Sequence, residues 1–80
     1  MPTVHRERGF RFYFYSNEND EPPHIHVDKG GASAKVWLQP LSLAWNRGYT
    51  AEELSRVLAI VREYRTSMIR AWHEHFGTAD

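Results

Sequence analysis

Hydrophobic and polar residues alternate along three short segments of the chain, and this two-residue period is typical of β-strands. The segments are Phe10–Tyr15, His24–Asp28 and Ala32–Leu38. A further β-prone segment, Thr3–Glu7, is joined to the first by Arg8-Gly9, where the glycine favours a hairpin turn. After Pro40, Leu41–Trp45 is interpreted as a short fifth strand. The pattern therefore predicts a small antiparallel sheet of four or five strands.

The C-terminal part of the chain has the different period of an amphipathic helix. Thr50 followed by Glu53 matches a capping box, in which each side chain satisfies a backbone N–H of the first turn. Hydrophobic residues then recur three and four positions apart, at Leu54, Val57, Leu58, Val61, Tyr64, Met68, Ala71 and Trp72. Gly77 stands where a helix-ending glycine is common. We expect one long helix, roughly 51 to 75, that covers one face of the sheet and extends beyond it toward a partner.

The alternation divides the predicted strands into two faces. One set is wholly apolar and should lie under the helix: Phe10, Phe12, Phe14, Ile25, Val27, Ala34, Val36 and Leu38. The other set combines rings, histidines and cations: Arg11, Tyr13, Tyr15, His24, His26, Lys35 and Trp37. Burying a large apolar side chain contributes about 1.5–3 kcal/mol, so the first set should stabilise the fold. The chain is predicted to be a single α+β domain over residues 1–80.

Composition narrows the functional classes. The chain has 80 residues and no cysteine, which excludes a disulfide scaffold, thiol catalysis and a cysteine-ligated zinc site. Ten basic and ten acidic residues give a formal net charge of zero, so a strongly basic field for nucleic acid is not expected. No apolar run reaches membrane-spanning length, and the first residues lack the apolar segment of a signal peptide. We therefore expect a cytoplasmic protein without membrane contact.

The mixed face of the predicted sheet suits three interpretations. Aromatic rings beside cations hold single-stranded nucleic acid, because bases stack on the rings and phosphates pair with the cations. Candidates for substrate binding are Arg11, Tyr13, Tyr15, Lys35, Trp37 and Arg47. The same residue types are favoured in protein interfaces. They also form cross-strand pairs that only stabilise a sheet. The order of the strands decides whether these side chains cluster.

His24 and His26 are two positions apart on a strand, so both should point to one exposed face. As an acid/base pair they could cleave RNA without a metal, one imidazole removing the 2′-hydroxyl proton and the other protonating the leaving oxygen. As a metal clip they would need a third ligand, either Asp28 on the same face or His5 on an adjacent first strand. The alternative is a polar strand face that happens to carry histidines. We expect no cofactor, with a divalent metal as the alternative.

The segment Trp45–Tyr49 also allows two interpretations. Arg47 could clamp a phosphate or a carboxylate with two parallel hydrogen bonds. Alternatively, the segment is a turn that leads into the helix, in which Trp45 and Tyr49 pack and Gly48 supplies an unusual dihedral angle. The structural interpretation is favoured here.

Four segments together resemble a bacterial family of short proteins of unknown function that carry a PPHxHV motif. They are Met1–Val4, Phe12–Glu18, Pro22–Val27 and Leu43–Tyr49, and the helix end Ala71–Phe76 fits as well. The resemblance covers nearly the whole chain. Members look like one half of two-gene cassettes, beside another small uncharacterised protein, which implies a toxin–antitoxin-like role. The family's signature positions carry over without an assigned activity: His24, His26, Trp45, Asn46 and Arg47.

The leading hypothesis is a toxin-like component of a bacterial toxin–antitoxin-type module that binds or cleaves RNA through the mixed face. If it is an enzyme, it is a metal-independent endoribonuclease with His24 and His26 as its acid/base pair. Arg11, Lys35 or Arg47 would then hold phosphate. The first alternative is a non-catalytic module, antitoxin-like or an adaptor, that binds the cognate small protein of the same cassette. The second is a His-X-His protein that binds a divalent metal, and a homodimer is compatible with each hypothesis.

Overall fold

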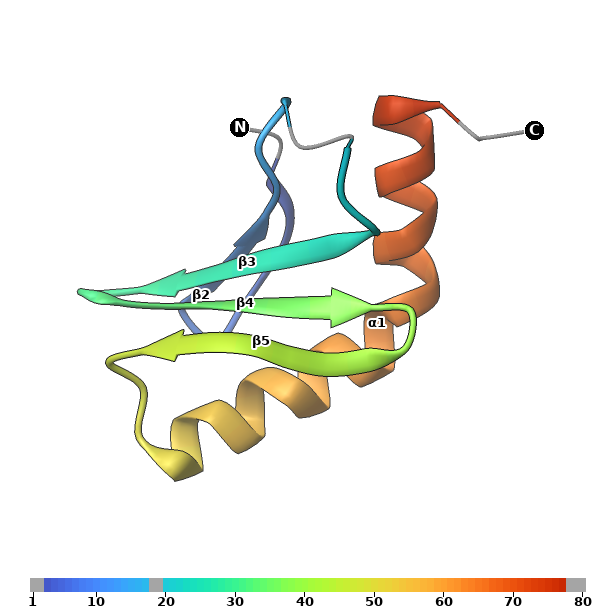
Figure 1. The fold of residues 1–80 in the computed structure, drawn as a ribbon. Coiled ribbons are helices and arrows are strands. Elements are labelled where there is room, and N and C mark those ends of the chain that lie inside the picture. Colours follow the sequence, from blue (N-terminus) through green and yellow to red (C-terminus); the bar gives the residue numbers. More distant parts are fainter. Residues whose placement is uncertain (1–2, 18–19, 78–80) are drawn as a thin grey trace.

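Five antiparallel strands follow one another in sequence order across one open sheet (Figure 1). They are β1 (Thr3–Glu7), β2 (Phe10–Tyr13), β3 (His24–Lys29), β4 (Ala32–Leu38) and β5 (Leu41–Arg47), followed by the helix α1 (Ala51–Phe76). The computed structural model describes residues 3–17 and 20–77. The predicted α+β fold is therefore confirmed, including the fifth strand, which runs two residues beyond Trp45 to Arg47.

Local sequence accounts for the connections between these elements. Arg8 and Gly9 form the turn between β1 and β2 with φ angles of 53° and 85°. Positive φ at both central residues is the geometry of a type I′ turn, whose twist matches that of the flanking strands. At the start of α1, the Thr50 hydroxyl accepts a hydrogen bond from the Glu53 backbone at 3.1 Å, and the Glu53 carboxylate accepts from the Thr50 backbone at 2.9 Å. The predicted capping box is thus present.

The core lies between α1 and the apolar face of the sheet, here called the core face. All eight residues predicted for this face are at most 2% exposed: Phe10, Phe12, Phe14, Ile25, Val27, Ala34, Val36 and Leu38. The helix contributes the buried side chains Val57, Ile60, Val61, Met68 and Trp72. Strand alternation and helix periodicity therefore identified the two surfaces that pack together. The described part of the chain contains no helix apolar enough to cross a membrane.

The helix bends at Tyr64, where φ is −104° and ψ is 15°. Its first half lies along the sheet, and its second half stands against the end of the sheet (Figure 1). The Trp72 ring packs 5.3 Å from the Phe14 ring and 4.8 Å from the His24 ring, measured between centroids. Trp72 therefore belongs to the core, and the helix does not extend beyond the sheet at this residue.

Candidate functional site

The face of the sheet that points away from the core, here called the open face, gathers side chains from four strands. Strand register arranges most of them in two rows. The first row contains Tyr13, His26, Lys35 and Trp45, and the second contains Arg11, Asp28, Ser33 and Arg47. His24 pairs with Trp37 farther along β3 and β4. The structure thus brings the side chains of the predicted mixed face together, and it adds Trp45 to them.

His26 lies at the centre of a cluster of rings on the open face. Its ring stacks on Tyr13 with centroids 5.4 Å apart and an angle of 24° between the planes. Tyr15 meets it edge-on at 4.9 Å, and Trp45 lies 6.2 Å away on the other side. Tyr15 and Trp45 are 38% and 36% exposed, whereas Tyr13 and His26 are buried. The outer two rings therefore flank a floor made by the inner two.

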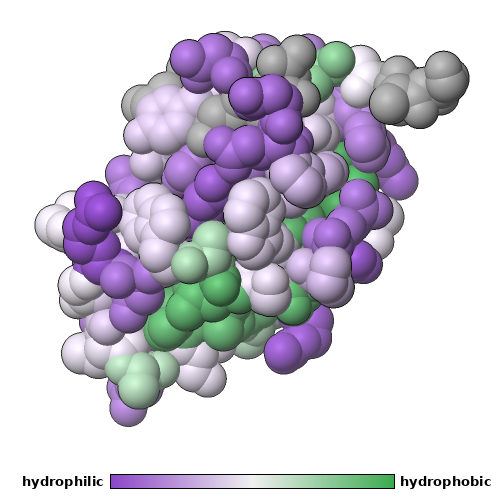
Figure 2. Space-filling view, viewed as in Figure 1, coloured by the Kyte–Doolittle hydropathy of each residue, from purple (hydrophilic) through white to green (hydrophobic). Residues whose placement is uncertain are grey.

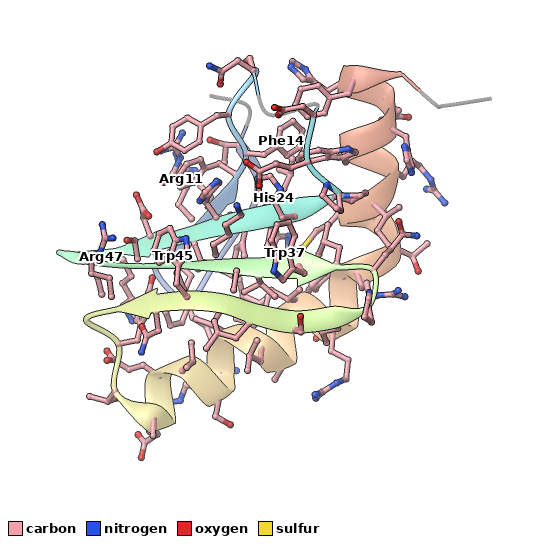
Figure 3. All side chains as sticks on the ribbon, viewed as in Figure 1. Arg11, Phe14, His24, Trp37, Trp45 and Arg47 are labelled. Atoms are coloured by element: carbon pink, nitrogen blue, oxygen red, sulfur yellow. The ribbon has the colours of Figure 1, made fainter. Side chains whose placement is uncertain are left out.

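Three cations lie over aromatic rings of the same face. Arg11 is 4.6 Å from the Tyr13 ring centre, Lys35 is 4.5 Å from that of Trp37, and Arg47 is 5.0 Å from that of Trp45. Figure 3 shows Trp45 and Arg47 side by side near the β3–β4 turn, with Trp37 toward the opposite end of the sheet. Such contacts contribute about 0.5–1 kcal/mol each at exposed sites and hold the cations on the face.

The three cations differ in their exposure and in whether a neighbouring side chain already accepts a hydrogen bond from them. Lys35 is half-buried, and its ammonium donates a hydrogen bond to the Glu21 carboxylate at 2.5 Å. Arg11 is half-buried, and its Nε donates to the Thr3 hydroxyl at 2.9 Å. Arg47 is exposed beside Trp45. Arg47 is therefore the best placed of the three to contact a phosphate.

A groove of about 360 Å³ crosses the open face beside the β3–β4 turn. Its chemically distinctive lining residues are Tyr13, Tyr15, His26, Asp28, Trp45 and Arg47. The Tyr13 hydroxyl donates to both carboxylate oxygens of Asp28 at 3.1 Å. Burial raises the pKa of Tyr13, and its hydrogen bonds to Tyr15 and Asp28 raise it further. Tyr13 therefore keeps its proton at neutral pH and holds the Asp28 carboxylate in the groove.

His24 differs from its sequence-based interpretation. Its ring is 5.1 Å from that of His26, so the two histidines are neighbours as expected. The expectation that both are exposed is wrong, because His24 is 0% exposed and packs against the rings of Trp37 and Trp72. Its Nδ1 lies 3.0 Å from the carbonyl oxygen of Pro22. The bend in α1 brings Trp72 over the start of β3 and covers this imidazole.

The structure does not assemble the ligand set considered for a metal. His5 belongs to β1, and β2 separates that strand from β3, so His5 is not adjacent to the His24–His26 pair. Its ring instead lies 4.1 Å from Tyr64, and its Nε2 is 3.0 Å from a Glu7 oxygen. Asp28 follows on the open face but binds the Tyr13 hydroxyl. Within residues 3–17 and 20–77, no three histidine or carboxylate side chains are grouped so as to hold a metal ion.

The turn between β5 and α1 has the structural role favoured from the sequence. The Asn46 side chain accepts a hydrogen bond from the Tyr49 backbone N–H at 3.2 Å and donates to its carbonyl at 3.1 Å. The Tyr49 hydroxyl donates to the Val27 carbonyl in the core at 2.9 Å. Unlike Tyr49, Trp45 faces the groove. The strand period could not have placed Trp45. A register shift in the pairing of β4 with β5 puts Leu43 opposite Val36 on the core face and Trp45 opposite Lys35 on the open face.

The comparisons with known proteins identify a family without assigning an activity. Residues 9–73 match the model of a family described as a domain of unknown function (DUF4160). Neither a curated protein nor a solved structure shows significant similarity to the chain.

Proposed function

The chain belongs to the family of domains of unknown function called DUF4160, and we propose that it binds single-stranded RNA through the open face. The observation that carries this proposal is the set of three cation–ring pairs contributed by β2, β4 and β5. The resemblance to short PPHxHV proteins in two-gene cassettes supports a wider role as one component of a bacterial toxin–antitoxin-like module.

The open face offers the two interactions on which sequence-tolerant RNA binding depends. Stacking of one base on an aromatic side chain contributes about 1–3 kcal/mol, and Tyr15 and Trp45 are the exposed rings of the cluster. The guanidinium of Arg47 can meet a phosphate with two parallel hydrogen bonds. Because the chain has no net charge, the attraction for RNA must come from this local arrangement. We therefore expect binding of moderate affinity that weakens with salt.

RNA cleavage by His24 and His26 is a separate part of the proposal. General acid/base catalysis requires both imidazoles to reach the reacting oxygens directly or through one water. Since Trp37 and Trp72 cover His24, the second half of α1 would have to move before that imidazole could contact RNA. Binding requires no such movement, because Tyr15, Trp45 and Arg47 are already exposed.

Fluorescence anisotropy with a labelled oligouridine tests RNA binding. Trp45→Ala should weaken binding by about fivefold to 150-fold, which corresponds to the loss of one stacked base. Arg47→Gln should also weaken it. Arg62→Gln is the matched control, because Arg62 is an exposed arginine on α1 rather than on the open face. Equal affinities of the wild type and the two open-face variants would contradict the proposal.

Growth assays test whether the chain is the toxic component of a module and whether toxicity depends on His24 and His26. Expression of the chain alone should arrest the growth of a bacterial culture if the protein is the toxic component. Normal growth with the double variant His24→Ala/His26→Ala would support catalysis by the two histidines. Circular dichroism must also show that this variant still folds, since both side chains are buried. A second variant, His26→Gln, leaves His24 and its contact with Trp72 in place. Full toxicity in a folded double variant would exclude the pair as the acid and base.

A second candidate function, binding of the cognate protein of the cassette, is favoured by β5. This strand is at the edge of the sheet and pairs only with β4 in the described part of the chain. Leu43 and Trp45 on β5 are two of the three large hydrophobic side chains exposed among the described residues. Figure 2 shows a hydrophobic patch over this part of the surface. An exposed apolar edge strand is a common site for pairing with another chain.

Co-purification with the product of the neighbouring gene tests this second function. Leu43→Lys should reduce recovery of the partner, because it places a charge in the hydrophobic patch. Thr66→Lys is the control, since Thr66 is exposed on α1. Unchanged recovery with Leu43→Lys would argue against the β5 edge as the interface.

A further inference from the structure

The groove on the open face contains a carboxylate close to two exposed aromatic rings, and we propose that it holds a guanine base of the RNA. This inference rests on the proposed RNA-binding function and deepens it by naming the base that the groove selects. The residues that carry it are Asp28 as the acceptor and Tyr15 and Trp45 as the aromatic walls.

Asp28 is positioned as a hydrogen-bond acceptor within the groove. It lies in the same cross-strand row as Arg11, Ser33 and Arg47, and its side chain is half-buried. The Tyr13 hydroxyl supplies one hydrogen shared between the two carboxylate oxygens. An ionised carboxylate has about four acceptor positions, so one shared hydrogen leaves capacity on both oxygens for a ligand. Tyr13 therefore orients the carboxylate without exhausting it.

The donor pattern of guanine matches a carboxylate better than that of the other bases. The N1–H and N2–H groups on its Watson–Crick edge are adjacent and parallel, so they can meet two carboxylate oxygens together. Adenine and cytosine present an amino group next to an acceptor nitrogen, and uracil presents one N–H between two carbonyls. Each of these would place an acceptor against the negative charge of Asp28. Unstacked bases in single-stranded RNA are commonly read on this edge.

The rest of the groove also suits a nucleotide. Tyr15 and Trp45 lie on either side of His26, with ring centroids 4.9 Å and 6.2 Å from it, so a base could be held between the two exposed rings. Aromatic rings around a carboxylate would also suit a quaternary ammonium ion. Arg47 lines this groove, however, and Arg11 is the cross-strand partner of Asp28. Their positive charges disfavour a cationic ligand and favour a base with an attached phosphate.

Anisotropy with oligouridines that differ at one central position tests the inference. The oligonucleotide with a central guanosine should bind about tenfold or more tightly than those with adenosine, cytidine or uridine there, which is the discrimination expected of a bidentate contact. Asp28→Asn should remove this preference, because an amide offers one acceptor and one donor. The Tyr13 hydroxyl can still donate to the amide oxygen. Glu74→Gln, an exposed helical carboxylate, is the control and should keep the preference.

The outcomes separate this inference from the function on which it rests. Equal binding of all four oligonucleotides would overturn guanine selection and leave RNA binding intact. No measurable binding of any of them would overturn both. A guanosine preference that persists in a folded Asp28→Asn variant would overturn the role of the carboxylate. Tighter binding of choline than of guanosine monophosphate would show that the groove takes a quaternary ammonium ion and would also overturn the inference.

Discussion

The imidazole ring of His24 lies 4.8 Å from the indole ring of Trp72, measured between their centroids. This contact joins the first residue of β3 to the final turns of α1. It exists because the helix bends at Tyr64 and its second half stands against the end of the sheet (Figure 1). One member of the His-X-His pair is consequently part of the core, while His26 forms the floor of the groove on the open face.

Trp72→Ala should lower the free energy of unfolding by about 3–5 kcal/mol, as expected for truncation of a buried aromatic ring. The Trp72 ring contacts Phe14 and His24, and its loss would leave a cavity between helix and sheet. Urea denaturation measures the change. Trp45→Ala is the matched control and should change stability by less than about 1 kcal/mol, because that ring is exposed. A fully stable Trp72→Ala protein would contradict the structural role.

Tyr49→Phe should lower the free energy of unfolding by about 0.5–1.5 kcal/mol, the usual contribution of one hydrogen bond. The Tyr49 hydroxyl donates to the Val27 carbonyl at 2.9 Å within the core, and the change removes only that oxygen. The packing of the ring against Phe10, with centroids 5.8 Å apart, should be kept. Urea denaturation at neutral pH is the measurement, and an unchanged midpoint would argue against this bond.

Stability should fall as the pH rises from about 10 to about 12. Burial raises the pKa of Tyr49 from 10.0 to about 12, with smaller contributions from the charges of Asp28 and Glu53. Between these values the unfolded chain releases a proton that the folded protein retains, so raising the pH favours unfolding. Burial of Tyr13 acts in the same direction. Urea denaturation across this range should show a shallower decline for Tyr49→Phe, and an identical decline would exclude Tyr49 as a contributor.

Gly48→Ala should destabilise the protein by about 1–3 kcal/mol, the range for strained backbone conformations. Gly48 has a φ of 100°, and a Cβ there would lie 3.3 Å from the Ala32 Cα. Gly31→Ala is the control, because a Cβ at position 31 would meet no described atom within 4 Å. Thermal denaturation compares the two variants. Equal stability of both would show that the turn tolerates a side chain at position 48.

Arg47→Gln should reduce the salt dependence of RNA binding. Each phosphate contact to a single strand contributes about −0.7 to the slope of log K against log salt concentration, and the variant should lose one such contact. Titrations at several potassium chloride concentrations give the slope. Arg62→Gln should keep the slope of the wild type, since Arg62 is exposed on the helix. A wild-type slope in Arg47→Gln would show that Arg47 does not contact phosphate.

Local patterns predicted most of the fold because they depend on neighbouring residues. The alternation of Phe10, Phe12 and Phe14 with polar residues follows from the two-residue period of a strand, and all three rings are buried. The capping box at Thr50 and Glu53 likewise depends on residues three positions apart. The extension of β5 to Arg47 was missed because Asn46, Arg47 and Gly48 were interpreted as part of the turn that leads into the helix.

The candidate site was predictable only in part. Strand period correctly placed Tyr13, His26 and Lys35 on one face, and Arg47 was already a candidate for phosphate binding. The burial of His24 was not predictable, since it depends on a bend at Tyr64, and neither proline nor glycine occurs within α1 to indicate one. The position of His5 was equally unpredictable from the sequence, because it depends on which strand lies between β1 and β3.

The sequence by itself determined which side chains share a face of β2, β3 and β4 and which stripe of the helix is apolar, because both follow from backbone geometry along one segment. Only the tertiary structure decided that Tyr15 and Trp45 flank His26 in a groove that Asp28 also lines, and that Trp72 covers His24. These contacts join residues on different elements. Their formation depends on strand order, register and the path of the helix, which are set by packing of the whole domain.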